Sequence, residues 1–255
     1  MCSSDLGAHE ISDRNGGQGP CECIFTPSRP SRAASRRDGK LNARKIMTQT
    51  GFAAEDPLSL VSRAATKLNS IWLGKTYPFA TFGRNVSIHY SCDIQRSISE
   101  QISIGGDVYM APDVWLNIAP GSDNSEPRIV LGSGCGIGRR STISARNKIV
   151  LEADVLLAPS VLIMDHNHEY SDIEKPIHAQ GVTSGGRIFI ERNCWLGHGA
   201  VIVCTHGELV LGRNSVVGAN AVVTRSFPPF SVIAGNPAKV VRAYDQQSGK
   251  WVRAE

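Results

Sequence analysis

Aromatic residues are scarce in this chain. They make up 6% of its 255 residues, whereas glycine alone accounts for 25. Few bulky rings and many small, turn-forming residues favour a β-rich fold with tight turns and thin layers over a thick aromatic core. The length is enough for one large domain or two small ones.

A disulfide framework is also missing. The cysteines number seven, which is odd, and their spacing is irregular: Cys2, Cys21, Cys23, Cys92, Cys135, Cys194 and Cys204. We therefore expect reduced thiols that pack as small hydrophobic side chains, as in cytosolic proteins.

Signals for export, for membrane insertion and for nucleic-acid binding are absent as well. Residues 1–20 lack the apolar core of a signal peptide, and the most apolar run, 149–164, contains Glu152, Asp154 and Pro159. The net charge of +4 is mild, and much of it falls in the first 45 residues, so the rest offers no basic face for nucleic acid. We expect a cytoplasmic protein with no transmembrane segment and no nucleic-acid partner.

The N-terminal part divides into two segments. Residues 1–50 are rich in Ser, Arg, Gly and Pro, and with so few large apolar side chains we expect a disordered tail. Residues 51–84 are interpreted as a helical cap. Asp56-Pro57 has the form of a helix start, and apolar residues at helical spacing then predict a helix over 57–72 that ends near Gly74 and covers one end of the C-terminal region.

From Val86 onward the sequence repeats every six residues. The main positions are aliphatic: Ile88 and Ile94; Ile104, Met110 and Leu116; Leu131, Ile137 and Ile143; Leu151, Leu157 and Ile163; Ile190, Leu196 and Ile202; and Leu211, Val217 and Val223. An aliphatic partner often stands two residues ahead, as Ile102 does for Ile104. Residues two apart on a strand face the same side, so each unit predicts a short strand and a corner. Stacked coils of such units bury a continuous aliphatic column.

Three segments near the C-terminus add specific motifs to these hexads: residues 193–197, 217–224 and 227–242. With them the chain resembles the hexapeptide-repeat O-acetyltransferases, in the branch of the maltose and galactoside enzymes and of surface polysaccharide biosynthesis. The resemblance covers about 85–242. It implies an all-β fold, a left-handed parallel β-helix, assembled as a homotrimer with active sites between subunits, and acetyl-coenzyme A as acyl donor. Residues 243–255 are left as a C-terminal extension, with a possible hairpin turn at Ser248-Gly249.

A polar loop over 164–187 interrupts the repeat and opens with the sequence Asp-His-Asn-His-Glu-Tyr, residues 165–170. Acyl transfer from a thioester to a hydroxyl needs a base, and histidine suits this task because its usual pKa lies near physiological pH. Counted from the hexad 161–163, the family's catalytic histidine falls on His168. His166 is the alternative base.

The neighbours of the two histidines are further candidates. Asp165 or Glu169 could orient the base by accepting its other N–H. Asn167 and Tyr170 belong to a motif that resembles the family's Asn-His-aromatic loop, and we expect them at the acceptor. Trp195 is expected to pack near the site.

The resemblance also implies where acetyl-coenzyme A binds. The matching positions are His198, Ala219, Thr224, Lys239 and Arg242. Lys239 and Arg242 suit the phosphate charge of that donor. Asp165, His166 and His168 are also residue types that bind metals, but the sequence does not reproduce the three-histidine arrangement of related zinc carbonic anhydrases, so we expect no metal.

The acceptor region departs from the sugar-acetylating relatives. Where they carry an acceptor-binding asparagine, a little before the equivalent of Thr142, this chain has Arg139 and Arg140 nearby. These residues could favour an anionic or nucleotide-linked acceptor. The sequence thus predicts an acetyl-coenzyme A dependent O-acetyltransferase that acts on a sugar hydroxyl in glycan or polysaccharide biosynthesis. The alternatives are N-acetylation of an amino sugar or amino acid, a non-catalytic structural β-helix, and a zinc hydratase.

Overall fold

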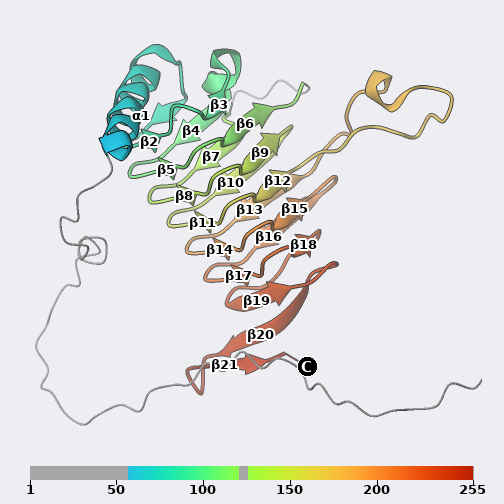
Figure 1. Cartoon of the computed structure of the whole chain (residues 1–255). Helices are drawn as coiled ribbons and strands as arrows, with labels where there is room; N and C mark the ends of the chain where they lie inside the picture. The colour runs from blue at the N-terminus through green and yellow to red at the C-terminus, as the bar shows by residue number, and fades with distance from the viewer. Residues whose placement is uncertain (1–56, 121–125, 255) are drawn as a thin grey trace, which may run out of the picture. The chain divides into compact units, whose positions relative to one another are not determined.

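A computed structural model describes residues 57–120 and 126–254 (Figure 1). The expected tail over 1–50, the start signal at Asp56 and the first three cysteines lie outside the described residues. Within the described residues, no helix is both long and apolar enough to cross a membrane.

Short strands stack into coils, and each full coil adds one strand to each of three sheets (Figure 1). The first sheet contains β1 (Thr81–Phe82), β4 (Ile102–Ile104), β7 (Ile129–Leu131), β10 (Lys148–Leu151), β13 (Arg187–Ile190) and β16 (Glu208–Leu211). The second contains β2 (Ser87–Ile88), β5 (Tyr109–Met110), β8 (Gly136–Ile137), β11 (Leu156–Leu157), β14 (Trp195–Leu196), β17 (Val216–Val217), β19 (Ser231–Ala234), β20 (Lys239–Asp245) and β21 (Lys250–Arg253). The third contains β3 (Asp93–Ile94), β6 (Trp115–Ile118), β9 (Thr142–Ala145), β12 (Leu162–Met164), β15 (Val201–Val203) and β18 (Val222–Val223).

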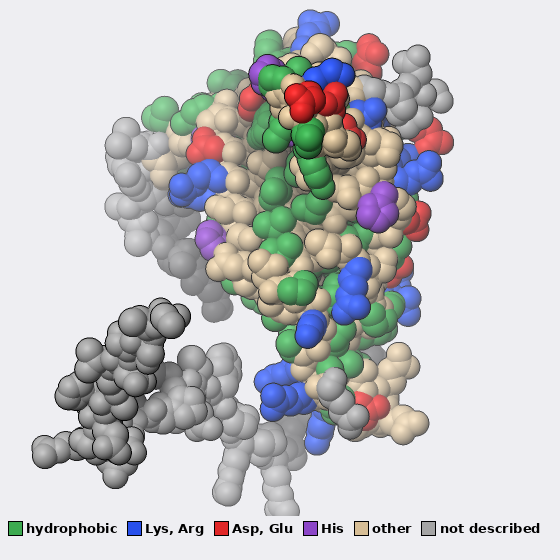
Figure 2. All heavy atoms as spheres, turned by 90° about the vertical axis from the view of Figure 1, so that its right-hand side faces the viewer, with side chains coloured by type: hydrophobic (Ala, Val, Ile, Leu, Met, Phe, Trp, Pro, Cys, Tyr) green, Lys and Arg blue, Asp and Glu red, His purple; other side chains and the backbone are tan. Residues whose placement is uncertain are grey.

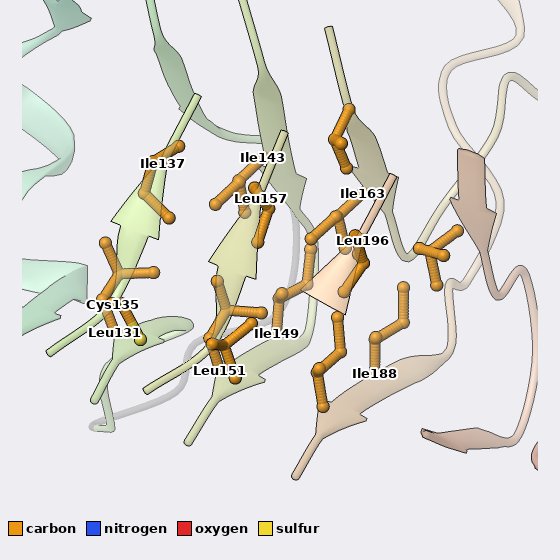
Figure 3. Close-up of a cluster of buried hydrophobic side chains, with 14 of the residues drawn as sticks. Leu131, Cys135, Ile137, Ile143, Ile149, Leu151, Leu157, Ile163, Ile188 and Leu196 are labelled. Carbon is orange, nitrogen blue, oxygen red and sulfur yellow. The ribbon is translucent and has the colours of Figure 1, made fainter. Parts of the chain in front are cut away.

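The predicted hexads form the interior of these coils. Strands pair in parallel with the same hexad position in register, so Leu131, Leu151 and Ile190 stand on successive strands of the first sheet. All three side chains are buried, and Figure 3 shows such side chains pointing into the space between the sheets. Full burial of one large aliphatic side chain stabilises the fold by about 1.5–3 kcal/mol, so the repeated column holds the coils together.

Cys135 and Cys194 occupy two of the partner positions and are buried in the same column. The described cysteines, including Cys92, are free thiols. Desolvation by burial raises the pKa of the thiols of Cys92, Cys135 and Cys194 from 9.0 to about 11. The sequence-based expectation of packed, reduced thiols holds for these positions.

This burial predicts slow alkylation of the native protein. At pH 8 iodoacetamide should label Cys135 and Cys194 only after denaturation, because the reactive thiolate is scarce and the sulfur is covered. The pKa of these thiols is higher in the folded chain than in the unfolded chain. Their contribution to the free energy of unfolding is therefore fully present below about pH 9 and is lost as the pH rises toward 11. Peptide mapping by mass spectrometry, with a urea-treated sample as control, checks the result. Equal labelling of native and denatured protein would contradict it.

The N-terminal helix, α1, spans Pro57–Thr76 and therefore runs beyond the expected end near Gly74. Gly74 is a packing residue rather than a helix stop, because a Cβ atom there would lie 2.9 Å from the ring of Phe82. The helix does cover the first coil, with a face that combines the buried Leu73 and polar side chains. The Ile88 N–H of β2 donates to Ser70 Oγ at 2.8 Å, and Asn69 Nδ2 donates to the Ile88 carbonyl at 3.2 Å.

These side chains satisfy backbone groups at the end of the sheet, where a preceding coil would otherwise supply partners. The apolar residues that predicted the helix face outward instead. Several are well exposed: Leu60, Val61, Leu68 and Ile71.

At the other end, β19 pairs with β20 in antiparallel fashion, and β20 pairs with β21. The expected turn at Ser248-Gly249 is confirmed, with Gly249 at a φ of 64°. Tyr244 lies opposite Trp251 across the hairpin, and their ring centroids are 5.5 Å apart. This hairpin extends the second sheet beyond the parallel coils.

Candidate active site

The interrupting loop projects from the stack between β12 and β13 (Figure 1). Its two arms run side by side: Thr183 N–H donates to the Asn167 carbonyl at 2.8 Å, and Glu169 N–H donates to the Gly181 carbonyl at 3.1 Å. A single antiparallel bridge pairs His168 with Val182 between these contacts. The arms therefore form a short ribbon that holds the backbone of His168.

Asp165 fastens the base of this loop to the preceding coil. Its side chain is fully buried. One carboxylate oxygen accepts the Arg146 N–H at 2.6 Å, and the other accepts the N–H groups of Asn147 and Lys148 at 2.8 and 2.9 Å. A carboxylate that accepts several N–H donors in a buried place is strongly held, so Asp165 fixes where the loop leaves the coil.

His166 is buried beside Asp165. Its Nδ1 lies 3.1 Å from Asp165 Oδ1, the oxygen that also accepts the Arg146 N–H. A carboxylate oxygen only accepts, so Nδ1 carries the proton and Nε2 of a neutral ring is left as an acceptor. Asp165 therefore orients His166. It does not orient His168, the histidine that the sequence favours as the base.

His168 lies two residues further along the same arm and is exposed. Within the described residues, neither of its ring nitrogens has a hydrogen-bond partner. Glu169 does not orient it either. The hydroxyl and backbone N–H of Ser171 and the N–H of Tyr170 engage the Glu169 carboxylate and hold its pKa below the usual range. His168 thus combines an accessible ring with a fixed backbone.

The sequence did not predict that the turn at residues 146–147 holds this loop in place. Asn147 Nδ2 donates to the carbonyls of Ser184 and Gly186 at 2.9 and 3.1 Å, on the returning arm. Arg146 Nη1 donates to the Pro120 carbonyl at 3.1 Å. The signal was present as the two-residue shift of the hexads between Ile143 and Leu151, which marks an extended corner at 146–147.

The remaining loop candidates are exposed. Asn167 shapes the chain locally, because its side-chain oxygen accepts the His168 N–H at 2.9 Å. Tyr170 is 66% exposed, and at the tip Ile173 is 91% exposed and Ile177 is 55% exposed. These apolar side chains of the projecting loop are uncovered within the described residues.

The candidate donor positions lie elsewhere on the chain. His198 and Ala219 follow β14 and β17, so they share one corner of successive coils, and the Asn220 N–H donates to the His198 carbonyl at 2.8 Å. Trp195 lies on the outer face of β14 and is 49% exposed. This corner precedes the strands of the third sheet, whereas the loop follows one of them, β12. The two therefore lie at opposite ends of these strands, and one chain does not bring them together.

The last three candidates are near the C-terminal end of the coils. Thr224 follows β18, while Lys239 and Arg242 stand on β20, and all three are exposed. On the neighbouring strand, Arg253 lies opposite Arg242. Positive side chains gathered on one hairpin suit an anionic group. Within residues 57–120 and 126–254, no three His, Cys, Asp or Glu side chains are grouped as metal ligands.

No protein-family model matches the sequence, but comparison with individual known proteins finds relatives of the chain. The chain is 30% identical over 118 residues to the putative lipopolysaccharide biosynthesis O-acetyl transferase WbbJ of Escherichia coli, covering 44% of this chain and 59% of that protein. It is 28% identical over 148 residues to the galactoside O-acetyltransferase of Lactococcus lactis, covering 58% of this chain and 65% of that protein. The chain spans about half the length of the curated relatives it matches.

A solved structure agrees in fold. AntD, an N-acyltransferase from Bacillus cereus in complex with dTDP and 3-hydroxybutyryl-CoA, superposes with a TM-score of 0.55 at 18% identity, covering 71% of this chain and 89% of that chain. The chain resembles the hexapeptide-repeat acetyltransferases. The resemblance expected from the sequence is therefore confirmed, and so is the left-handed parallel β-helix with one short N-terminal helix.

Proposed function

We propose that this protein is an acetyl-coenzyme A dependent O-acetyltransferase that acts on a sugar hydroxyl in glycan or polysaccharide biosynthesis. The observation that carries the proposal is the histidine-bearing loop at the interruption of the β-helix, in a chain similar to WbbJ and to a galactoside O-acetyltransferase. AntD, crystallised with an acyl-coenzyme A, supports the same kind of donor. A cytoplasmic location fits a donor of this kind.

His168 acts as the general base. Its exposed ring accepts the proton of the acceptor hydroxyl, and the freed oxygen attacks the acyl carbonyl carbon directly. The thioester supplies an already reactive acyl group, so no acyl-enzyme is needed. His168 then returns the proton to the leaving sulfur. Asp165 and His166 hold the loop that carries this base.

The active site forms between two subunits of a homotrimer. The base and the donor corner lie at opposite ends of the strands of the third sheet, and β12 and β15, with three residues each, are roughly 10 Å long. A neighbouring copy brings its donor corner to the loop. The outer face of the third sheet supports such packing, because Leu162, Val201 and Val222 point outward, and Figure 2 shows hydrophobic side chains along the face below the loop.

The donor binds along the corner of His198 and Ala219, with its phosphates near Lys239 and Arg242. Thr224 lies on the same route. Both charged residues are exposed, as a site for a large, soluble anion requires. Trp195, Asn167 and Tyr170 are assigned to the acceptor side.

N-acylation is the second candidate, because AntD is an N-acyltransferase. O-acetylation is favoured because two relatives, at 30% and 28% identity, are named as O-acetyltransferases, whereas the likeness to AntD at 18% identity is one of fold.

Thiol release from acetyl-coenzyme A tests the proposal. Purified protein is incubated with neutral sugars, sugar phosphates, sugar nucleotides and amino sugars, and product mass spectra separate esters from amides. We expect release that depends on a hydroxyl acceptor, from a species with the light-scattering mass of a trimer. Failure to bind coenzyme A in calorimetry would overturn the proposal, and a product formed only on amines would replace O- with N-acetylation.

A further inference from the structure

A pocket of ≈ 550 Å³, lined mostly by residues with polar or charged groups, lies between α1 and the second sheet. From the helix, hydroxyl side chains and Lys67 line it, and from the sheet side come His89, Tyr109 and Arg139. Pockets of this size hold ligands as large as a sugar nucleotide. None of the described residues that line it is acidic.

The pocket presents positive charge. Lys67 and Arg139 enter from opposite walls, and within residues 57–120 and 126–254 neither forms a salt bridge. Arg63 adds a third cationic side chain to the lining. Arginine and lysine converging on hydroxyl groups form a setting that favours a phosphate. The next residue in the chain, Arg140, does not line the pocket. Of the two arginines that the sequence suggested for an anionic acceptor, only Arg139 lies at this site.

Neutral hydrogen-bond donors complete the lining. The Ser91 backbone N–H donates to His89 Nδ1 at 3.2 Å, so in the neutral ring the proton sits on Nε2. Nε2 lies 3.4 Å from Ser62 Oγ at the pocket wall. Tyr109 is 51% exposed and offers an aromatic face on which a sugar or base can pack.

The pocket continues the corner assigned to the acyl donor. A ladder of backbone hydrogen bonds follows this corner from Pro112 through Arg139 and Pro159 to His198, at 2.9–3.1 Å. Arg139 follows β8 and His198 follows β14, with β11 between them. Two strand spacings amount to roughly 10 Å along the stack. A ligand in the pocket would thus lie beyond the reactive end of a donor that is bound along the corner.

From this placement we propose that the pocket binds the phosphate or diphosphate group of a phosphorylated sugar acceptor. The proposal rests on the proposed transferase function and narrows its substrate class. Lys67 and Arg139 neutralise the phosphate, and Tyr109 packs on the attached ring. The sugar then extends along the corner toward His198 of the same chain and the base of a neighbouring chain.

Calorimetry on the full chain tests this with pyrophosphate, glucose 1-phosphate, UDP-glucose and glucose. We expect the phosphate-bearing probes to bind, more weakly as salt rises, and glucose to bind at least about tenfold more weakly. Lys67→Gln and Arg139→Gln should each weaken pyrophosphate binding by about tenfold or more. The matched controls Lys75→Gln, on the same helix, and Arg140→Gln, on the same corner, should change it by less than about twofold.

Two results would contradict the proposed phosphate site: no phosphate-bearing probe binds the wild-type protein, or the control variants weaken binding as much as the pocket variants do. Titration of coenzyme A separates this failure from that of the transferase proposal. Lys239→Gln should weaken coenzyme A and spare pyrophosphate, and Arg139→Gln should do the reverse. If pyrophosphate binds and coenzyme A does not, the transferase proposal fails and the anion pocket stands.

Discussion

Replacing His168 with asparagine is expected to lower kcat of acetyl transfer by about 10²–10⁴-fold, with the affinity for coenzyme A and the melting temperature close to wild type. The ring is exposed and has no partner within the described residues, so its loss removes chemistry and little structure. The measurement is thiol release under saturating acceptor, beside a thermal melt and a coenzyme A titration.

His166→Asn is the matched control for this prediction. Asparagine keeps an N–H that can donate to Asp165, so the loop anchor should survive with a reduced melting temperature and a loss of kcat below about tenfold. The assignment would move to His166 if this variant were inactive and His168→Asn kept its activity. In that case the Asp165–His166 pair would be the base and its orienting carboxylate.

Asp165→Asn is expected to lower the free energy of unfolding by about 3 kcal/mol and to release the loop. The buried carboxylate accepts the N–H groups of residues 146–148 and the proton on His166, and an amide NH₂ group cannot accept them. Hydrogen exchange should then rise over 165–186, and kcat should fall because His168 loses its fixed backbone. Urea unfolding and exchange by mass spectrometry measure both effects.

Asp172→Asn makes the same chemical change on the same loop and serves as control. Its carboxylate pairs with Lys175 at 3.0 Å in an exposed position, so the change in unfolding free energy should stay below about 1 kcal/mol. If the two variants were equally stable, Asp165 would not be the anchor of the loop.

The sequence predicted the coils well because one residue type at a fixed period decides them. Leu131, Leu151 and Ile190 fall in register since a parallel ladder aligns equal positions of each repeat. The helix was harder to predict. By the usual rule its apolar residues should face the coil. Ser70 and Asn69 lie there beside Leu73 instead, because backbone groups at the end of a sheet need hydrogen-bond partners.

The candidate site was predictable in its residue types but not in its pairings. Loop residues 165–170 stood out as a chemically capable cluster, but their sequence could not show that Asp165 reaches back to backbone groups nineteen positions earlier. Such contacts depend on how one coil stacks on the next. The roles of Arg146 and Asn147 were not predicted for the same reason, because their side chains donate to backbone carbonyls of the returning arm, those of Val182 and Ser184.

Subunit complementation tests the shared active site most directly. Chains with His168→Asn, which keep a donor corner, are co-expressed with chains carrying Ala219→Trp, which keep the base but block the corner. Each variant alone should be an inactive trimer. In a cyclic trimer every mixed assembly regains one intact site, so random mixing should restore about a quarter of wild-type thiol release. A mixture no more active than its separate variants would show that base and donor corner do not meet between subunits.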